Sequence, residues 1–314
     1  MSEIWLAPLH GLTLYHFRNC IYRHSSGIDA AIAPFMPAQE SAKLNVRKWK
    51  DFYPLNNRQV DTIPQLMGVV PTFFVDTMNA LHEEYGWTRF NWNLGCPMAQ
   101  IVRKRRGCGL MPFPDEVEKV VETACGLPYR FSIKMRLGLH SVTEGLEIIS
   151  RLNSYPLDFI VIHPRLGDWQ YKGVPDLDAF EKLLELTKHR VIYSGDVFQV
   201  DDYRNLKTRF PQVDAWMLGR GLLRNPFLAE QLKETPSEKD YHLRFNEFYE
   251  DLNQTLKLSR GESGTLPVLK ELWHYFAHFY GLTAEQLHSL LIIQNYTEFD
   301  SAVKKIVEEN RSVC

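Results

Sequence analysis

The 314-residue chain is 45% hydrophobic and 24% charged with a formal net charge of −2, a composition typical of an ordinary globular protein. This balance argues against a globally basic nucleic-acid-binding protein, and no apolar run approaches the roughly 18 residues of a membrane-spanning helix. The amino terminus has no signal-peptide pattern, so we expect a cytoplasmic protein. Five cysteines without a C-x-x-C pair argue against disulfides and zinc or iron–sulfur sites, so we expect reduced thiols and no metal.

Short apolar runs alternate with amphipathic helical patterns over the first part of the chain. The runs recur about every 25 to 40 residues, and several are continuously hydrophobic, as parallel strands covered on both faces are. Strands are expected at residues 4–8, 30–34, 62–67, 89–94, 131–136, 159–163, 191–194 and 215–218. Helices are expected at residues 72–85, 114–125, 143–154, 177–189 and 200–210.

This alternation favours an α/β fold of the (β/α)8 TIM-barrel type over an open doubly wound sheet, because the number of strands matches that barrel. The strand pattern ends near Lys233, and Pro236 with Ser237 is typical of a linker. Helices follow at residues 241–259, 267–280, 284–294 and 298–309. We therefore expect a catalytic barrel domain over residues 1–235 and a small all-helical domain over residues 236–314.

Polar side chains gather at the carboxyl ends of the expected strands, where barrel active sites are built. Taken singly, each has an ordinary structural explanation, such as a satisfied core histidine or a core amide network. Taken together they indicate a polar cofactor pocket. They are Pro8-Leu9-His10, Gln65, Asn93 with Cys96, Lys134 with Arg136, His163 with Arg165, Ser194-Gly195-Asp196 and Gly219-Arg220-Gly221.

Cys96 occupies a turn directly after the strand at residues 89–94. Gly95 permits a sharp change of direction and Pro97 removes a backbone donor, so the strand cannot continue. We expect the thiol at the edge of a loop. From this segment alone, a buried small hydrophobic side chain is an equally good interpretation.

The last two strand ends indicate which cofactor the pocket holds. Barrels often bind phosphate after strands seven and eight through backbone N–H groups, and Arg220 could add a guanidinium fork. Lys134 could supply positive charge near a reduced flavin ring. Flavin mononucleotide (FMN) is therefore the expected cofactor.

Short motifs in a fixed order extend over most of the chain. They are LAPLHGLT from Leu6, QLMG from Gln65, NLGCPM around Cys96, IKMRLG around Lys134, IHPR at His163, DWQYKG from Asp168, YSGDV around Ser194 and MLGRGLLRNPF from Met217. With these motifs the chain resembles the dihydrouridine synthases, flavin-dependent enzymes that reduce uridine in transfer RNA. One departure is Ser194, because asparagine is usual at that position in the family.

The resemblance implies a role for each matching residue. Cys96 would be the acid, Asn93, Arg136 and Arg165 would lie on the substrate side, and Lys270 would hold the RNA. NADPH or NADH would be the transient reductant, and we expect a monomer acting on tRNA. The flavin contacts would be Pro8, Leu9, His10, Gln65, Lys134, His163, Ser194, Gly195, Asp196, Gly219 and Arg220.

The expected chemistry agrees with these roles. Reduction of the uracil C5–C6 bond needs a hydride at C6 and a proton at C5, and an unperturbed thiol with a pKa of about 8.5 is protonated near neutrality. The target base must leave its stack to enter a barrel mouth. The basic run Arg103, Lys104, Arg105 and Arg106 is expected to contact RNA phosphate, although a solvated face is the simpler alternative.

Two other functions stay open. The first is a Schiff-base lyase that uses Lys134 as its nucleophile, which requires a depressed lysine pKa. The second is a non-catalytic RNA-binding barrel. The presence of Cys96, Lys134 and His163 together makes this second function the less economical one.

Overall fold

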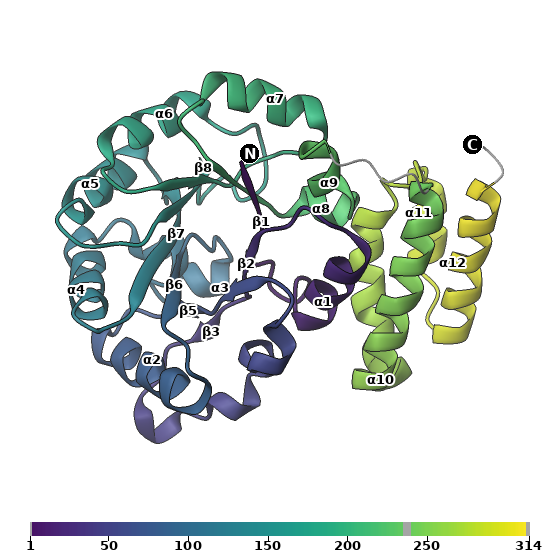
Figure 1. The fold of residues 1–314 in the computed structure, drawn as a ribbon, viewed down its shortest axis with the longest axis horizontal. Helices are drawn as coiled ribbons and strands as arrows, with labels where there is room; N and C mark the ends of the chain where they lie inside the picture. The colour runs from purple at the N-terminus through teal and green to yellow at the C-terminus, as the bar shows by residue number, and fades with distance from the viewer. Residues whose placement is uncertain (1, 235–239, 312–314) are drawn as a thin grey trace.

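The computed structural model describes residues 2–234 and 240–311, which form a barrel with a helical bundle against one side (Figure 1). The predicted linker at Pro236 and Ser237 and the predicted boundary at residues 235/236 lie outside the described residues. The strands are β1 Glu3–Leu6, β2 Ala30–Ile32, β3 Met36–Pro37, β4 Asp61–Ile63, β5 Gln65–Met67, β6 Arg89–Leu94, β7 Arg130–Gly138, β8 Ile160–Leu166, β9 Val191–Tyr193 and β10 Ala215–Leu218.

The helices cover the outside of the barrel and form the carboxyl-terminal bundle. They are α1 Tyr15–His24, α2 Pro71–Tyr85, α3 Ala99–Val102, α4 Pro114–Cys125, α5 Val142–Leu152, α6 Leu177–Leu186, α7 Val200–Arg209, α8 Arg220–Arg224, α9 Leu228–Leu232, α10 Tyr241–Phe276, α11 Ala284–Leu291 and α12 Tyr296–Arg311. Short 3₁₀ helices lie at Ser41–Lys43, Val46–Lys48, Lys50–Phe52, Pro54–Asn57 and Gly107–Leu110.

The strands of the described residues form one parallel sheet in the order β3-β5-β6-β7-β8-β9-β10-β1-β2-β4. The chain itself connects the two edges of this sheet. Only Pro64 separates β4, which pairs with β2 at one edge, from β5, which pairs with β6 near the other edge. Pro64 has no N–H to give to the ladder, but its carbonyl oxygen accepts from Asn91 N at 2.9 Å. The sheet therefore closes into the expected barrel of eight strands, two of them interrupted.

These interruptions are where the predicted strands differ from the observed ones. The strand expected at residues 62–67 is divided at Pro64, and the strand expected at 30–34 stops at Ile32 and resumes as β3 beside β5. The expected helix at 177–189 ends at Leu186 because Thr187 is already extended. The other outer helices begin within a residue of their predicted starts, helped by Pro114 at the first turn of α4.

The barrel interior is filled by its own apolar cluster. The Trp5 and Phe159 rings meet edge to face with centroids 5.1 Å apart, and both side chains are almost completely buried. The remaining members are Ala7, Ala30, Ile32, Ile63, Val161, Ile192, Ala215 and Met217. The barrel is thus a packed core and not a pore.

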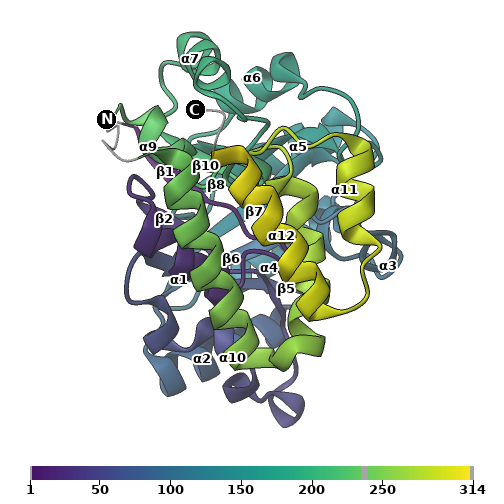
Figure 2. The same ribbon diagram turned by 90° about the vertical axis from the view of Figure 1, so that its right-hand side faces the viewer.

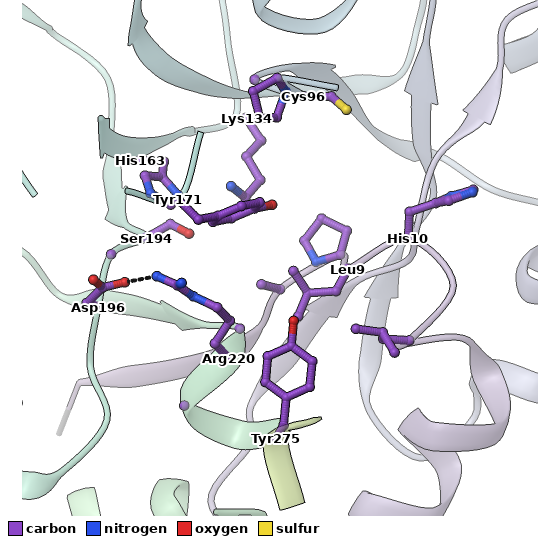
Figure 3. A pocket seen from close by; sticks show the side chains of 18 of the residues that line it. Leu9, His10, Cys96, Lys134, His163, Tyr171, Ser194, Asp196, Arg220 and Tyr275 are labelled. Atoms are coloured by element: carbon purple, nitrogen blue, oxygen red, sulfur yellow. Dashed lines mark hydrogen bonds and ion pairs between the residues drawn. The ribbon is translucent and has the colours of Figure 1, made fainter. Parts of the chain in front are cut away.

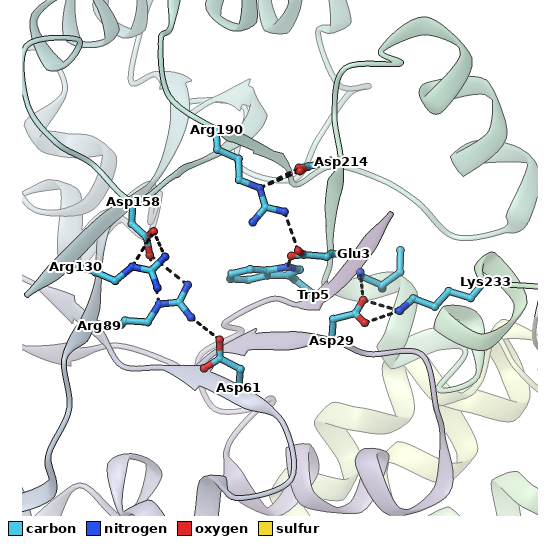
Figure 4. A network of polar contacts seen from close by, with 11 residues as sticks. Glu3, Trp5, Asp29, Asp61, Arg89, Arg130, Asp158, Arg190, Asp214 and Lys233 are labelled. Atoms are coloured by element: carbon cyan, nitrogen blue, oxygen red, sulfur yellow. Dashed lines mark hydrogen bonds and ion pairs between the residues drawn. The ribbon is translucent and has the colours of Figure 1, made fainter. Parts of the chain in front are cut away.

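Charged residues close the amino-terminal end of the barrel (Figure 4). Trp5 Nε1 donates to Glu3 at 2.8 Å, so the core aromatic is tied to this layer. Arginines bridge acidic residues of neighbouring strands in the groups Asp61–Arg89–Asp158–Arg130 and Asp214–Arg190–Glu3. With this end committed to ion pairs, the carboxyl end is the one left for a site.

In the carboxyl-terminal bundle, α10 packs against α1 and α8 (Figure 2). Asp251 of α10 pairs with Arg23 and His24, and Arg244 pairs with buried Glu230. The long α10 is broken at Gly261, which has a φ of 66°, so its second half starts earlier than the predicted residue 267. The helical bundle and the barrel share one apolar cluster.

We expect Phe159→Ala to lower the free energy of unfolding by about 3–5 kcal/mol, because it leaves a cavity against Trp5 in a closed core. Urea denaturation monitored by circular dichroism measures this change. The control is Val174→Ala, at a side chain that is 80% exposed, for which a change within about 0.5 kcal/mol is expected. A loss for Phe159→Ala no larger than the control's would show that the barrel interior is loosely packed.

Candidate active site

A cavity of about 520 Å³ lies at the carboxyl end of the barrel, between the strand-end loops and α10 (Figure 3). Most of the residues predicted for the site line it. These are Pro8, Leu9, His10, Asn93, Cys96, Lys134, Arg136, His163, Ser194, Gly195, Asp196, Gly219 and Arg220. Predicted residues outside the lining are Gln65, Arg165, Arg103, Lys104, Arg105, Arg106 and Lys270.

The loop that carries Cys96 is held by a chain of side-chain amides. Asn93 Oδ1 accepts from the backbone N–H groups of Gly95 and Cys96 at 3.2 and 3.0 Å. Asn93 Nδ2 donates to Gln65 Oε1 at 2.9 Å, and Gln65 Nε2 donates to Asn91 Oδ1 at 2.7 Å. Gln65 is fully buried by these contacts, so the structure gives it a supporting position behind Asn93 and not a place in the cavity wall.

The other side of the Cys96 loop packs against residues 107 and 108. A Cβ on Gly107, whose φ is 56°, would lie 2.6 Å from the carbonyl oxygen of Cys96. Cys108 donates to the same oxygen from both its backbone N and its thiol, each at 3.2 Å. The backbone at Cys96 therefore has little freedom to move.

The environment of Cys96 keeps its thiol protonated. Burial raises the pKa of Cys96, and the lowering influences of the Met98 backbone and of the cations Arg136 and Lys134 do not reverse that rise. The residue is only partly buried and its side chain lines the cavity. The thiol can thus donate a proton to a bound molecule near neutral pH.

Arg136, expected on the substrate side, ties two loops together. Its guanidinium donates to the carbonyl oxygens of Gly95 at 3.1 Å, Leu166 at 2.8 Å and Gln170 at 2.6 Å. It also lies 5.4 Å from the ring of Tyr171, which projects over the cavity. Arg136 therefore positions the Cys96 loop and the Tyr171 loop while lining the wall between them.

Lys134 and His163 are both shifted toward their neutral forms. Burial, with a smaller contribution from Arg136, lowers the pKa of Lys134 to about 7. Burial, followed by Arg136 and Lys134, lowers the pKa of His163 well below its usual range. Arginine can only donate, so the 3.1 Å contact from Arg165 Nη1 makes His163 Nε2 the acceptor and places the ring proton on Nδ1.

A single carboxylate after the seventh barrel strand orders arginines that belong to the sixth strand and to the helix after the eighth. Asp196 pairs with Arg165 at 2.5 Å and with Arg220 at 2.5 Å. Figure 3 shows the pair with Arg220. Burial opposes its ionisation, but these two guanidinium groups hold the pKa of Asp196 below its usual range. Arg165 also donates to Gly173 O, is only 1% exposed and lies behind the cavity lining, so its expected place on the substrate side stays a prediction.

Two of the glycines at the seventh and eighth strand ends are required for close packing, apart from any approach of a ligand to their backbone. A Cβ on Gly195 would lie 2.2 Å from the Tyr193 hydroxyl, and one on Gly221 would lie 2.1 Å from Val197 O. Gly219 has more room, since its nearest contact would be Ala7 Cβ at 3.4 Å. The glycine pattern is thus a weaker indicator of phosphate binding than the charged side chains beside it.

The cavity also contains residues that sequence reasoning missed. Tyr171 belongs to the DWQYKG motif, so a sequence signal for it was present. Phe198 lies in the segment after Asp196, and Arg224 is the last residue of α8, which begins at Arg220. α10 and the turn after it also contribute to the cavity wall, with Glu271, His274, Tyr275 and His278. No sequence motif indicated these residues, because their position depends on how the carboxyl-terminal helices pack on the barrel.

The basic run expected to contact RNA is divided by the fold. Arg105 pairs with Glu116 at 2.5 Å and lies 3.6 Å from the centre of the Phe113 ring. Glu116 is not adjacent to the basic run in the sequence, so this ion pair was not expected. Arg103 and Lys104 are exposed. Lys270 lies on α10, next to the cavity residue Glu271.

Comparisons with known proteins give similarities over most of the chain. The dihydrouridine synthase family model matches residues 5–298. The chain is 27% identical to a tRNA-dihydrouridine(16) synthase of Pseudomonas putida, over 86% of this chain and 80% of that protein. It is 25% identical to tRNA-dihydrouridine synthase B of Pasteurella multocida, over 76% and 71% of the two chains.

A solved old yellow enzyme homologue from Zymomonas mobilis has a similar fold, with a TM-score of 0.52 and 13% identity over 76% of this chain and 90% of that one. Among the described residues, no group of three or more histidine, cysteine or acidic side chains could hold a metal ion. The helices in the described ranges include none long and apolar enough to cross a membrane.

We expect Gly107→Ala to be markedly more destabilising than Gly86→Ala. Both glycines have positive φ, but a Cβ at Gly86 meets nothing within 4 Å, so its cost is the left-handed backbone alone, about 1–2 kcal/mol. At Gly107 the collision with Cys96 O adds about 1–3 kcal/mol. Thermal and urea unfolding measure both variants. Equal losses would mean that residue 107 does not support the Cys96 loop.

Proposed function

The chain belongs to the dihydrouridine synthase family, and we propose that it catalyses the FMN-dependent reduction of uridines in tRNA to 5,6-dihydrouridine. The observation that carries the proposal is the meeting, in one cavity, of a protonated Cys96 thiol with a cationic wall containing Lys134 and Arg220. The names of the relatives from Pseudomonas putida and Pasteurella multocida give the same reaction class. We propose NADPH or NADH as the reductant and monomeric action in the cytoplasm.

The cavity has the properties that FMN requires. Its size is in the range of pockets for cofactors of this kind, and its wall combines aromatic and apolar side chains with cations. We assign the flavin contacts to Pro8, Leu9, His10, Lys134, His163, Ser194, Gly195, Gly219 and Arg220. Asp196 is assigned to orienting Arg220, because its carboxylate would repel a phosphate.

When bound, reduced FMN supplies the hydride that adds to C6 of the uracil. Cys96 supplies the proton at C5, so the C5–C6 double bond is replaced by two C–H bonds and the thiol becomes a thiolate. The neighbouring cations Arg136 and Lys134 stabilise that thiolate until solvent returns the proton. Asn93 acts in this proposal through the two hydrogen bonds that fix the loop on which the thiol stands.

The tRNA is proposed to lie across the carboxyl face of the barrel with its target base flipped into the cavity. Arg103, Lys104, Arg106 and Lys270 are the candidates for phosphate contacts. Arg105 is a weaker candidate because it is already paired with Glu116. We assign Arg136 to shaping the substrate side of the cavity.

The lowered pKa of Lys134 is the one observation that favours a Schiff-base lyase. Two measurements separate the functions. Flavin absorbance in the purified protein supports the reductase, whereas borohydride trapping of a carbonyl substrate onto Lys134 supports the lyase. Binding of tRNA without either result would indicate a non-catalytic barrel.

We expect Cys96→Ala to lower dihydrouridine formation by about 10²- to 10⁴-fold, the usual contribution of a general acid. Turnover is measured by mass spectrometry of unmodified tRNA incubated with the protein and NADPH. The control is Cys125→Ala, a partly buried thiol at the end of α4 and outside the cavity, which should change turnover by less than about twofold. Equal turnover of Cys96→Ala and wild type would refute the role of Cys96 as the acid.

FMN affinity is expected to fall as pH rises through about 7. FMN is expected to bind the protonated form of Lys134 better, so affinity is highest below that pKa and is lost above it, by at most about tenfold per pH unit for one proton. Fluorescence titration of flavin-free protein between pH 6.5 and 9 gives the profile. Lys134→Met should flatten it, and parallel profiles for the two proteins would exclude Lys134 as the titrating group.

A further inference from the structure

We propose that Arg224 is a second phosphate-binding arginine, which makes this protein select FMN over riboflavin. The inference rests on the proposed function, since it takes FMN as the cofactor. Arg224 is not among the site residues expected from the sequence, in which Arg220 is the arginine expected to contact the phosphate. Arg224 lines the same cavity.

Arg224 is placed to act with Arg220. The two residues are four positions apart on α8 and therefore lie on the same side of the helix. Their guanidinium carbons lie 4.1 Å and 5.6 Å from the centre of the Phe198 ring, Arg224 being the closer. Both guanidinium groups thus lie near the same aromatic ring, and Phe198 fixes the place of the Arg224 guanidinium.

The charges around Arg224 are not balanced by the protein. Asp196 is the carboxylate that acts on this group, and it is already shared by Arg165 and Arg220. The ion pairs among the described residues do not include Arg224, and its Nε is buried there without a hydrogen-bond partner. His278, the neighbouring histidine of the wall, has a pKa lowered by burial and then by Arg224, so it is neutral near pH 7.

The guanidinium groups of Arg165, Arg220 and Arg224 and the carboxylate of Asp196 together carry a net charge of +2. Glu271 lines the same cavity, but the ion pairs among the described residues do not join it to any of these arginines. A phosphate monoester carries about −1.5 to −2 near pH 7, which matches the net charge of the arginines with Asp196. Burial and the repulsion from Arg220 both lower the pKa of Arg224, as expected for two cations that lack a shared anion. Gly195 and Gly219 line the same wall, so a phosphate there would also approach the backbone.

Binding of FMN and riboflavin to flavin-free protein tests the proposal, because the two ligands differ only in the phosphate. The readout is quenching of flavin fluorescence, independent of turnover. Arg224→Met keeps an aliphatic stem against Phe198, Arg224→Lys keeps the charge, and Arg204→Met on the exposed surface of α7 is the control. Affinity for unmodified tRNA is measured with the same variants.

We expect Arg224→Met to weaken FMN binding by about 10- to 100-fold and to leave riboflavin binding unchanged, as for the loss of a charged hydrogen bond. Arg224→Lys should recover part of the loss, and Arg204→Met should bind both ligands like wild type. Equal weakening of FMN and riboflavin would overturn the proposal in favour of a structural role. Unchanged FMN affinity with weakened tRNA binding would assign Arg224 to an RNA phosphate instead. Failure of the wild type itself to bind FMN would contradict the proposed function, and is thus distinct from an effect confined to Arg224.

Discussion

The side-chain amide of Asn93 is the contact on which the site depends. It links β6, the buried Gln65 of β5 and the backbone of the Cys96 turn, so that barrel closure and placement of the thiol become one arrangement. Gly107 and Cys108 close the loop from behind. A thiol fixed in this way can meet a base at one defined atom, which is what protonation at C5 of uracil requires.

The cavity combines a proton donor with an excess of positive charge. Cys96 stays protonated because burial outweighs its cationic neighbours. Burial also lowers the pKa of Lys134 to about 7, which leaves it partly charged near neutral pH, and lowers the pKa of His163 well below its usual range. The ion pairs of Asp196 with Arg165 and Arg220 provide the only strong local compensation among the cavity contacts described above. An anionic cofactor would complete this balance, which is the reason we propose a phosphate-bearing flavin for this cavity.

Sequence patterns predicted the barrel and most of the cavity because parallel strands place their carboxyl ends together, so position along a strand becomes position in space. Pro64 interrupts a strand without opening the barrel, because β4 before it pairs with β2 and β5 after it pairs with β6. These pairings are tertiary contacts that the local sequence does not specify. Side-chain partners were not predictable in the same way: Arg105 meets Glu116 and Arg165 is buried under Asp196 only through tertiary contacts. The wall from α10, including Tyr275, depends on how the tail packs on the barrel.

Reduction of uridine in tRNA by way of Cys96 is the activity that we propose for this cavity. The most direct measurement is mapping of dihydrouridine by mass spectrometry in tRNA from cells that lack the gene, with complementation by wild-type or Cys96→Ala protein. We expect dihydrouridine to be lost at defined positions and to be restored by the wild type but not by the variant. Unchanged dihydrouridine in the deletion strain, or full restoration by Cys96→Ala, would contradict this proposal.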